Sequence, residues 1–184
     1  MEKVLVTGAT GYIALHCIHQ LLNQGYAVNG SLRSPERKDE IIEALKKDNT
    51  PVENLSLFTF NLTEDDGWDE GMEGCDFLLH VASPLSINTH DEDYFVKPAV
   101  SGVKRALKFA KKHSVKKVIL TSSVAAILET GEDKQYFDET DWSDPESPEI
   151  SHYSKSKTLA EMAAWDFVKE EGHPFELAVI NPAL

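Results

Sequence analysis

Tyr153 and Lys157 are the pair whose types and spacing most directly suggest acid–base chemistry. They stand four residues apart in the segment YSKSK, and a helix would place them on one face. A phenol normally titrates near about 10, and a neighbouring ammonium stabilises its phenolate form. The pair could therefore exchange a proton near neutral pH.

A second source of hydroxyl groups is the segment TSS at residues 121–123, which follows an apolar run typical of a buried strand. Open parallel α/β sheets bind their ligands at the carboxyl ends of their strands. A serine hydroxyl at this position could hold the carbonyl oxygen of a substrate while Tyr153 protonates it. Each signal alone is weak, and their combination with the glycine turn described next makes them specific.

Residues 4–14, VLVTGATGYIA, run from a buried-type strand through a turn into an apolar helical pattern. Gly8 permits a tight turn, Gly11 lets the backbone approach phosphates, and the small Ala14 allows the helix to pack on the strand. The N-terminus of that helix would offer free N–H groups to an anion. The pattern predicts a dinucleotide pyrophosphate site, and the alternative is an ordinary glycine-rich turn.

The end of the second strand indicates which dinucleotide would bind. Sites for NAD usually carry an acidic residue there, whereas this chain has Arg33, followed by further cations. We expect Arg33 to stack on adenine and pair with a 2′-phosphate, with Arg37 or Lys38 as the second cation. The alternative is that these are solvated charges at the start of a helix.

Strand and helix patterns alternate along the whole chain. Strands are predicted at residues 3–7, 27–32, 55–61, 77–82, 117–121 and 177–180, and helices at 12–24, 36–47, 68–72, 94–113 and 152–171. This order predicts an α/β fold, a Rossmann-type doubly wound parallel sheet with helices on both faces, in one domain spanning residues 1–184. The polar stretch 129–151 is long for a connecting loop and suggests an active-site flap.

Composition limits the classes of partner. The net charge of −13 argues against nucleic acid, and no apolar run approaches the length that a membrane span needs. Without a secretory signal pattern, we expect a cytoplasmic protein in which Cys17 and Cys75 are reduced thiols. His16 and His19 share a helix face but lack a third ligand nearby in sequence, so no metal site is expected.

Taken together, these segments resemble the extended short-chain dehydrogenase/reductases of the NAD-dependent epimerase/dehydratase superfamily. The similarity is to the branch of dihydroflavonol reductase, cinnamoyl-CoA reductase and microbial aldehyde and ketone reductases. The matching segments, in family order, are 7–14, 31–33, 80–84, 97–98, 121–123, 153–161 and 181–182. The resemblance implies that Ser123 positions a carbonyl, Tyr153 is the acid, and Lys157 assists Tyr153 while binding the nicotinamide ribose.

The resemblance also implies a cofactor, NADP(H), with NAD(H) less expected. The residues implied in its binding are Thr7, Gly8, Thr10, Gly11, Tyr12, Ile13, Arg33, Lys38, Asn61, Leu62, Val81, Ala82, Ser83, Tyr153, Lys157 and Pro182. Among them, Asn61 and Leu62 fall where the family contacts adenine, and Pro182 would flank the nicotinamide.

Four features depart from the family pattern. Asn61 replaces an acidic residue, and its side-chain oxygen can still accept from the adenine amino group. Ser101 stands where several relatives have a relay asparagine. Leu128 replaces the asparagine that recognises a hydroxylated ring, which makes a dihydroflavonol substrate unexpected. The sequence given stops at Leu184, where relatives continue into a substrate-binding lobe. We therefore expect residues 1–184 alone to bind NADP(H) weakly, to reduce carbonyls negligibly and to self-associate through apolar surface near Pro84, Leu85, Ile127 and Leu128.

The sequence thus predicts an NADP(H)-dependent oxidoreductase that reduces a small-molecule aldehyde or ketone to an alcohol, or the N-terminal portion of one. Two alternatives remain: a nucleotide-sugar epimerase or dehydratase, which shares the three catalytic residues, and a non-catalytic NADP-binding redox sensor. The sequence specifies neither the substrate nor the oligomeric state.

Overall fold

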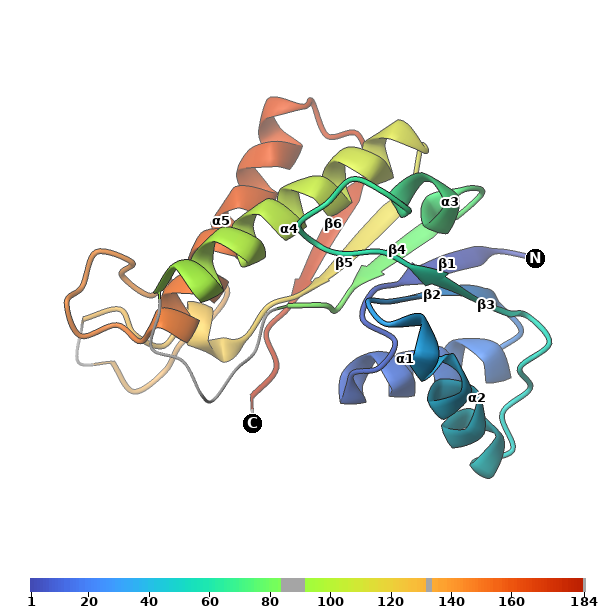
Figure 1. The fold of residues 1–184 in the computed structure, drawn as a ribbon. Helices are drawn as coiled ribbons and strands as arrows, with labels where there is room; N and C mark the ends of the chain where they lie inside the picture. Colours follow the sequence, from blue (N-terminus) through green and yellow to red (C-terminus); the bar gives the residue numbers. More distant parts are fainter. Residues whose placement is uncertain (84–91, 132–133, 184) are drawn as a thin grey trace.

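Strands and helices alternate along the chain, as predicted (Figure 1). A computed structural model describes residues 1–83, 92–131 and 134–183. The strands are β1 (Lys3–Val6), β2 (Ala27–Leu32), β3 (Leu55–Thr59), β4 (Phe77–His80), β5 (Lys117–Thr121) and β6 (Glu176–Ile180). The α-helices are α1 (Tyr12–Asn23), α2 (Lys38–Lys47), α3 (Trp68–Met72), α4 (Glu92–Lys112) and α5 (His152–Glu170). Two three-residue helical turns are also present: η1 (Pro35–Arg37) precedes α2, and η2 (Val124–Ala126) follows β5.

The six strands form one parallel sheet in the order β3-β2-β1-β4-β5-β6. From β1 the chain proceeds outward through β2 and β3, and then returns to add β4, β5 and β6 on the other side. The chain thus leaves β1 and β4 toward opposite sides of the sheet, and open α/β sheets bind their ligands at the carboxyl edge beside such a change of direction. This order confirms the predicted Rossmann-type fold.

Helices cover both faces of the sheet (Figure 1). One face packs against α1 and α2 through an aliphatic core that includes Val4, Ile18 and Leu45. The other face packs against α3, α4 and α5. Trp68 is fully buried there, and its ring stacks on Phe109 with centroids 5.8 Å apart. The two apolar cores hold the strand ends in fixed positions for the loops that they carry.

Most predicted bounds differ from the structure by one or two residues, within the usual uncertainty of helix and strand ends. The predicted helix 36–47 is divided into η1 and α2. The predicted strands 3–7, 55–61 and 77–82 end early, because Thr7, Asn61 and the segment 81–82 leave the sheet and enter the loops at its carboxyl edge. The predicted strands are thus too long at the carboxyl edge of the sheet, where the chain passes into the loops.

The long segment 129–151 is attached to the fold at several points. Ser143 is fully buried; its hydroxyl donates to the Ala125 carbonyl and accepts from the Glu129 N–H, both at 2.8 Å. The Glu129 carboxylate in turn accepts hydrogen bonds from the Ser151 N–H and the Ser154 hydroxyl at the start of α5. These contacts tie the loop that follows Ser123 to the first turn of the helix that carries Tyr153.

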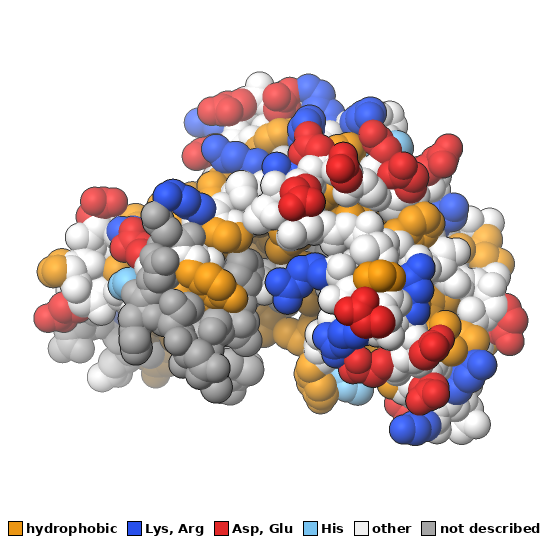
Figure 2. Space-filling view, in the orientation of Figure 1, with side chains coloured by type: hydrophobic (Ala, Val, Ile, Leu, Met, Phe, Trp, Pro, Cys, Tyr) orange, Lys and Arg blue, Asp and Glu red, His pale blue; other side chains and the backbone are white. Residues whose placement is uncertain are grey.

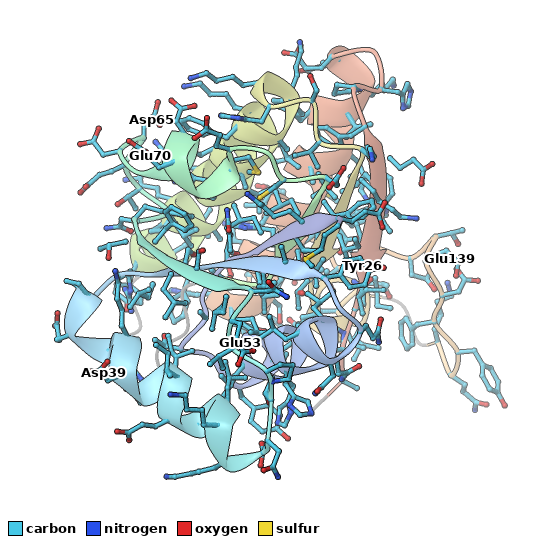
Figure 3. All side chains as sticks on the ribbon, turned by 90° about the vertical axis from the view of Figure 1, so that its right-hand side faces the viewer. Tyr26, Asp39, Glu53, Asp65, Glu70 and Glu139 are labelled. Carbon is cyan, nitrogen blue, oxygen red and sulfur yellow. The ribbon has the colours of Figure 1, made fainter. Side chains whose placement is uncertain are left out.

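Many acidic side chains lie at the periphery of the molecule. Figure 3 shows Asp39, Glu53, Asp65, Glu70 and Glu139 directed outward from different elements, and all five are exposed. Within the described ranges no helix is long and apolar enough to cross a membrane. The two cysteines are free thiols, as predicted.

Candidate active site

The predicted site residues converge on the carboxyl edge of the sheet. The space-filling view shows a hollow there, between the part that carries α4 and α5 and the part that carries α1 and α2 (Figure 2). Every strand contributes the residues that follow it, since all six run in the same direction. These residues are Gly8 after β1, Arg33 after β2, Asn61 after β3, Ala82 after β4, Ser123 after β5 and Pro182 after β6.

Gly8 forms the turn between β1 and α1 in a backbone conformation that side chains disfavour, with φ +76°. A Cβ at this position would lie 3.0 Å from Ala82 Cβ and 3.2 Å from Ala82 Cα, so the glycine also allows the β1 and β4 loops to touch. Gly11 precedes α1 and donates its N–H to the Gly8 carbonyl at 2.8 Å. No side chain caps α1 and no acid lies in its first turn, which leaves its N–H groups suited to a phosphate.

The Thr7 side chain makes hydrogen bonds within the protein. Its hydroxyl is fully buried and accepts from the Val81 and Ala82 N–H groups, both at 3.0 Å. Because these two donors occupy its lone pairs, its proton must go to His80 Nδ1, also at 3.0 Å. His80 is therefore a neutral imidazole with its proton on Nε2, and burial lowers its pKa to about 3. Thr7 thus joins the β1 and β4 loops, and its predicted contact with a cofactor stays a prediction.

Arg33 is an exposed cation at the end of β2, with neither a hydrogen bond nor an ion pair to the described part of the chain. Arg37 differs, because its guanidinium is held in a two-point contact with Glu40, both distances 2.7 Å. Lys38 is half-buried at the start of α2. Between the two alternatives for a second cation, Lys38 is thus less committed to a partner than Arg37.

Ser31 connects the end of β2 to the glycine turn. Its hydroxyl accepts from the Gly8 N–H at 3.0 Å, and its carbonyl accepts from the Ala9 N–H at 2.7 Å. Any group bound by Arg33 would therefore lie beside the turn that is suited to a pyrophosphate.

Ser123, Tyr153 and Lys157 come from two elements that meet at the edge of the sheet. Ser123 follows β5 and caps η2, where its Oγ accepts from the Ala125 N–H at 3.2 Å. Tyr153 and Lys157 lie in the first two turns of α5, whose start is capped by the Ser151 hydroxyl. The Lys157 ammonium lies 5.9 Å from the centre of the Tyr153 ring, and it donates to the Thr121 carbonyl at 3.3 Å. The structure thus brings the predicted lysine and tyrosine together on one helix face.

Lys157 is only 6% exposed, which is unusual for a lysine. Burial lowers its pKa to about 8, and the charge of Glu161 one turn further along α5 opposes that change. Lys157 faces a small cavity whose other polar lining residues include His80, Ser122 and Glu161. A lysine titrating near 8 could exchange protons close to neutral pH, which suits the acid–base role predicted for this pair.

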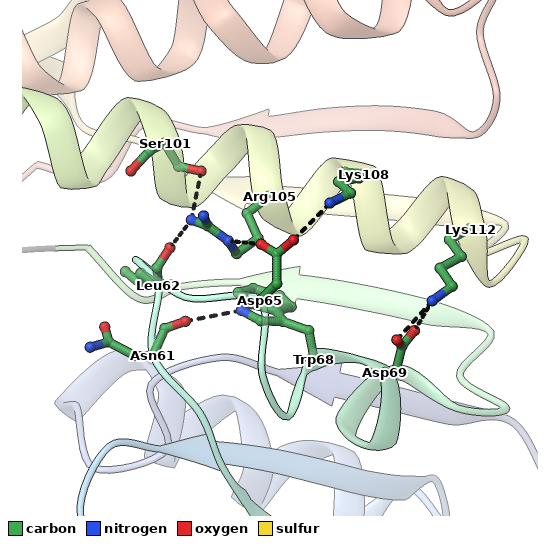
Figure 4. A network of polar contacts seen from close by, with 9 residues as sticks. All are labelled: Asn61, Leu62, Asp65, Trp68, Asp69, Ser101, Arg105, Lys108 and Lys112. Atoms are coloured by element: carbon green, nitrogen blue, oxygen red, sulfur yellow. Dashed lines mark hydrogen bonds and ion pairs between the residues drawn. The ribbon is translucent and has the colours of Figure 1, made fainter.

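Asn61 and Leu62 lie in the loop after β3, which is fastened to α4 by ion pairs (Figure 4). Arg105 donates to the Leu62 carbonyl and to Asp65, and Lys108 pairs with Asp65 at 2.8 Å. These two cations hold the pKa of Asp65 below its usual range. The Asn61 carbonyl accepts from the buried Trp68 indole at 3.0 Å, and its side-chain oxygen accepts from the Thr63 N–H. The backbone that would meet an adenine is thereby fixed.

The remaining predicted residues differ in their exposure. Tyr12 and Ile13, at the start of α1, are 81% and 42% exposed. Half-buried side chains at the same edge belong to Thr10, Val81, Ser83 and Pro182. Pro84 and Leu85 lie outside the described residues, so the apolar surface predicted around them is not described. Leu128 is 45% exposed, beyond η2.

Ser101 does not line the cavity beside Lys157. It is exposed on α4, where its carbonyl accepts from Arg105 at 3.5 Å, whereas α4 contributes Ala99 and Val103 to the cavity. Whether Ser101 replaces the relay asparagine is not decided by this position.

Three polar residues of this region were not predicted from the sequence. His80 ends an otherwise apolar strand, Glu161 follows Lys157 by one helical turn, and Asn181 directly follows β6. They could have been recognised as polar residues at positions that the apolar pattern predicts to be buried, because buried polar groups need hydrogen-bond partners. Among the described residues, no group of three or more His, Cys, Asp or Glu side chains could hold a metal ion.

Comparison with known families and proteins shows what this chain is similar to. A model described as the NAD dependent epimerase/dehydratase family matches residues 4–182. Among curated proteins, a cinnamoyl-CoA reductase (CAD2) of Medicago truncatula is 38% identical, over 98% of this chain and 57% of its own length. A dihydroflavonol 4-reductase of Arabidopsis thaliana is 36% identical, over 95% of this chain and 47% of its own. The chain thus spans about half the length of the curated relatives it matches.

Solved structures of reductases are also similar to this chain. The yeast methylglyoxal/isovaleraldehyde reductase Gre2 complexed with NADPH superposes with a TM-score of 0.84 at 34% identity, over 98% of this chain and 57% of that one. Vestitone reductase from alfalfa, Medicago sativa, superposes with a TM-score of 0.81 at 32% identity, over 98% and 56% of the two chains.

Proposed function

This chain belongs to the NAD dependent epimerase/dehydratase family, and we propose that the full-length protein is an NADP(H)-dependent reductase of a small aldehyde or ketone. The observation that carries the proposal is the pairing of Tyr153 with Lys157 on one face of α5, where the Lys157 ammonium also reaches the Thr121 carbonyl, two residues before Ser123. The relatives described above are reductases, and the Gre2 structure contains NADPH.

The residues present fit such a cofactor. A side chain at Gly8 would fill the space against Ala82, and the N-terminus of α1 is left open to a phosphate. Arg33, exposed and without a partner in the described residues, is suited to the 2′-phosphate that distinguishes NADP from NAD. When bound, the nicotinamide supplies the hydride.

The protein's own residues would supply the proton and the orientation. We propose that the Ser123 hydroxyl donates to the carbonyl oxygen of the substrate and that Tyr153 transfers its proton to that oxygen as it gains charge. The Lys157 ammonium stabilises the tyrosinate that results, and it holds the ribose of the cofactor. Lys157 can serve both groups because its charge is buried and faces the same edge of the sheet.

The test is the oxidation of NADPH by the full-length protein with a panel of aldehydes and ketones, followed by the absorbance of NADPH. Tyr153→Phe should abolish turnover while NADPH affinity stays nearly unchanged, because the hydroxyl acts in the chemical step. Lys157→Ala should weaken both. Turnover by Tyr153→Phe at the wild-type rate would refute the assignment, and epimerisation of a nucleotide sugar without net NADPH oxidation would replace it.

A further inference from the structure

Asn181, the first residue after β6, joins the two halves of the candidate site. Its side-chain Nδ2 lies 3.0 Å from the Ser123 carbonyl oxygen and 2.9 Å from Glu161 Oε2. An asparagine amide has two N–H groups in one plane, so it can donate one to each acceptor. Asn181 therefore connects the loop that carries Ser123 to the helix that carries Tyr153 and Lys157.

Glu161 is held in a position that makes this connection rigid. Its side chain is 6% exposed, and a buried carboxylate needs compensating donors or charges. Its Oε2 accepts from Asn181, its Oε1 accepts from the Trp165 indole at 3.5 Å, and the Lys157 ammonium lies one turn away on α5. The contacts fix Glu161 on the inner face of α5, between the helix and the end of β6.

Backbone hydrogen bonds on either side of Asn181 align the same strand ends. The Ser122 N–H donates to the Ile180 carbonyl at 2.8 Å, and the Val124 N–H donates to the Pro182 carbonyl at 3.1 Å. These bonds join the loop after β5 to the loop after β6, but neither reaches α5. Lys157 joins α5 to the Thr121 carbonyl, and Glu129 joins the loop to the first turn of α5. The side-chain contacts of Asn181 are the ones that join the Ser123 carbonyl itself to the helix.

We infer that Asn181 and Glu161 are positioning residues that set the separation between Ser123 and the Tyr153–Lys157 pair. The inference rests on the proposed reduction, in which Ser123 and Tyr153 must both reach one carbonyl oxygen. Productive geometry in such sites is held to within about 0.5 Å, and a displacement of about 1 Å can cost roughly 100-fold in rate. Neither residue touches the substrate in this account.

The decisive variant is Asn181→Asp, which keeps the shape of the side chain but removes both donors. In the full-length protein it should lower kcat by about 10- to 100-fold, while the Kd for NADPH stays within twofold of wild type, because Gly8 and Arg33 are untouched. Unchanged kcat would overturn the inference.

A double variant separates positioning from stability. In Glu161→Gln combined with Asn181→Asp, the new amide can donate to the new carboxylate, so the link between α5 and β6 is restored with reversed polarity. The Ser123 carbonyl still lacks its donor. Melting temperature should therefore recover while kcat stays low, and recovery of both would show a merely structural role. Trp165→Phe is the matched control, since it removes a donor to Glu161 without affecting Ser123, and its kcat should match wild type.

Crystal structures of the wild type and Asn181→Asp test the inference without relying on activity. The Ser123 backbone should move relative to α5 by more than about 0.5 Å in the variant, and an unchanged position would overturn the inference. If the wild-type protein oxidises no NADPH with any carbonyl, the proposed function fails, and the displacement of Ser123 still decides whether Asn181 sets its position.

Discussion

Replacement of Gly8 by alanine tests how the glycine turn is built, because two separate costs can be assigned to it. Gly8→Ala places a side chain at φ +76°, which costs about 1–2 kcal/mol of stability. The new Cβ also lies 3.0 Å from Ala82 Cβ and 3.2 Å from Ala82 Cα, and overpacking of this kind typically costs about 1–3 kcal/mol. We therefore expect a total loss of about 2–5 kcal/mol.

Gly172→Ala is the matched control for the backbone cost. Gly172 has φ +71°, and a Cβ there would meet nothing within 4 Å, so only the loss of about 1–2 kcal/mol is expected. Adding Ala82→Gly to Gly8→Ala removes the closer contact and should recover part of the remaining loss. The free energies of unfolding are measured by urea denaturation of the three full-length variants and the wild type.

NADPH titrations of the same proteins extend the test to the turn itself. Gly8→Ala should weaken NADPH binding at least about tenfold, equivalent to 1.4 kcal/mol, because the turn must shift away from Ala82. Gly172→Ala should bind like the wild type. Equal destabilisation by Gly8→Ala and Gly172→Ala, together with no recovery from Ala82→Gly, would refute the proposed contact between the two loops.

Three further changes have expected outcomes. Arg33→Asp should abolish a preference for NADPH over NADH that corresponds to about 1.5–3 kcal/mol in the wild type, and calorimetric titration with both nucleotides measures it. For Lys157, whose pKa is about 8 in the folded protein and near 10.5 when unfolded, the unfolded chain binds more protons between these values, so stability rises with pH. In urea denaturation, the free energy of unfolding of the wild type should therefore rise relative to that of Lys157→Met by up to about 3 kcal/mol between pH 7 and 10. A difference between the two proteins that does not change with pH would contradict the burial of the Lys157 charge. Thr7→Val should destabilise the protein by at least about 2 kcal/mol, because it leaves His80 and the Val81 and Ala82 N–H groups without their partner; thermal unfolding unchanged by this substitution would exclude the role assigned to the hydroxyl.

The fold could be predicted because its signals are local. Short apolar runs alternating with helical patterns specify a parallel sheet, and Gly8 and the Tyr153–Lys157 spacing each depend on a few neighbouring residues. The segment 121–123 could be placed at the carboxyl edge for the same reason. The position of these residues at that edge was thus accessible from sequence pattern, and their chemical roles stay predictions.

Contacts between distant segments were not accessible in this way. The hydrogen bond of Thr7 to His80 could not be predicted, because the histidine lies 73 residues away. Arg37 was one of two candidate cations, and the structure pairs it with Glu40. Asn181 and Glu161 acquire their significance only from a contact across 20 residues of chain. Partner choice among polar groups depends on tertiary packing, which no local pattern encodes.

The position of β1 has a consequence for how the molecule assembles. Although β1 is the first of these six strands along the chain, it is central in the sheet, with β2 on one side and β4 on the other. Its pairing with β2 closes a short loop, whereas its pairing with β4 must wait until residues 77–79 exist and then closes a far longer one. Until then, one side of β1 presents unpaired backbone groups, which are able to recruit another strand. β1 therefore joins the two halves of the sheet, and until β4 is available its free side is exposed to pairing with other strands.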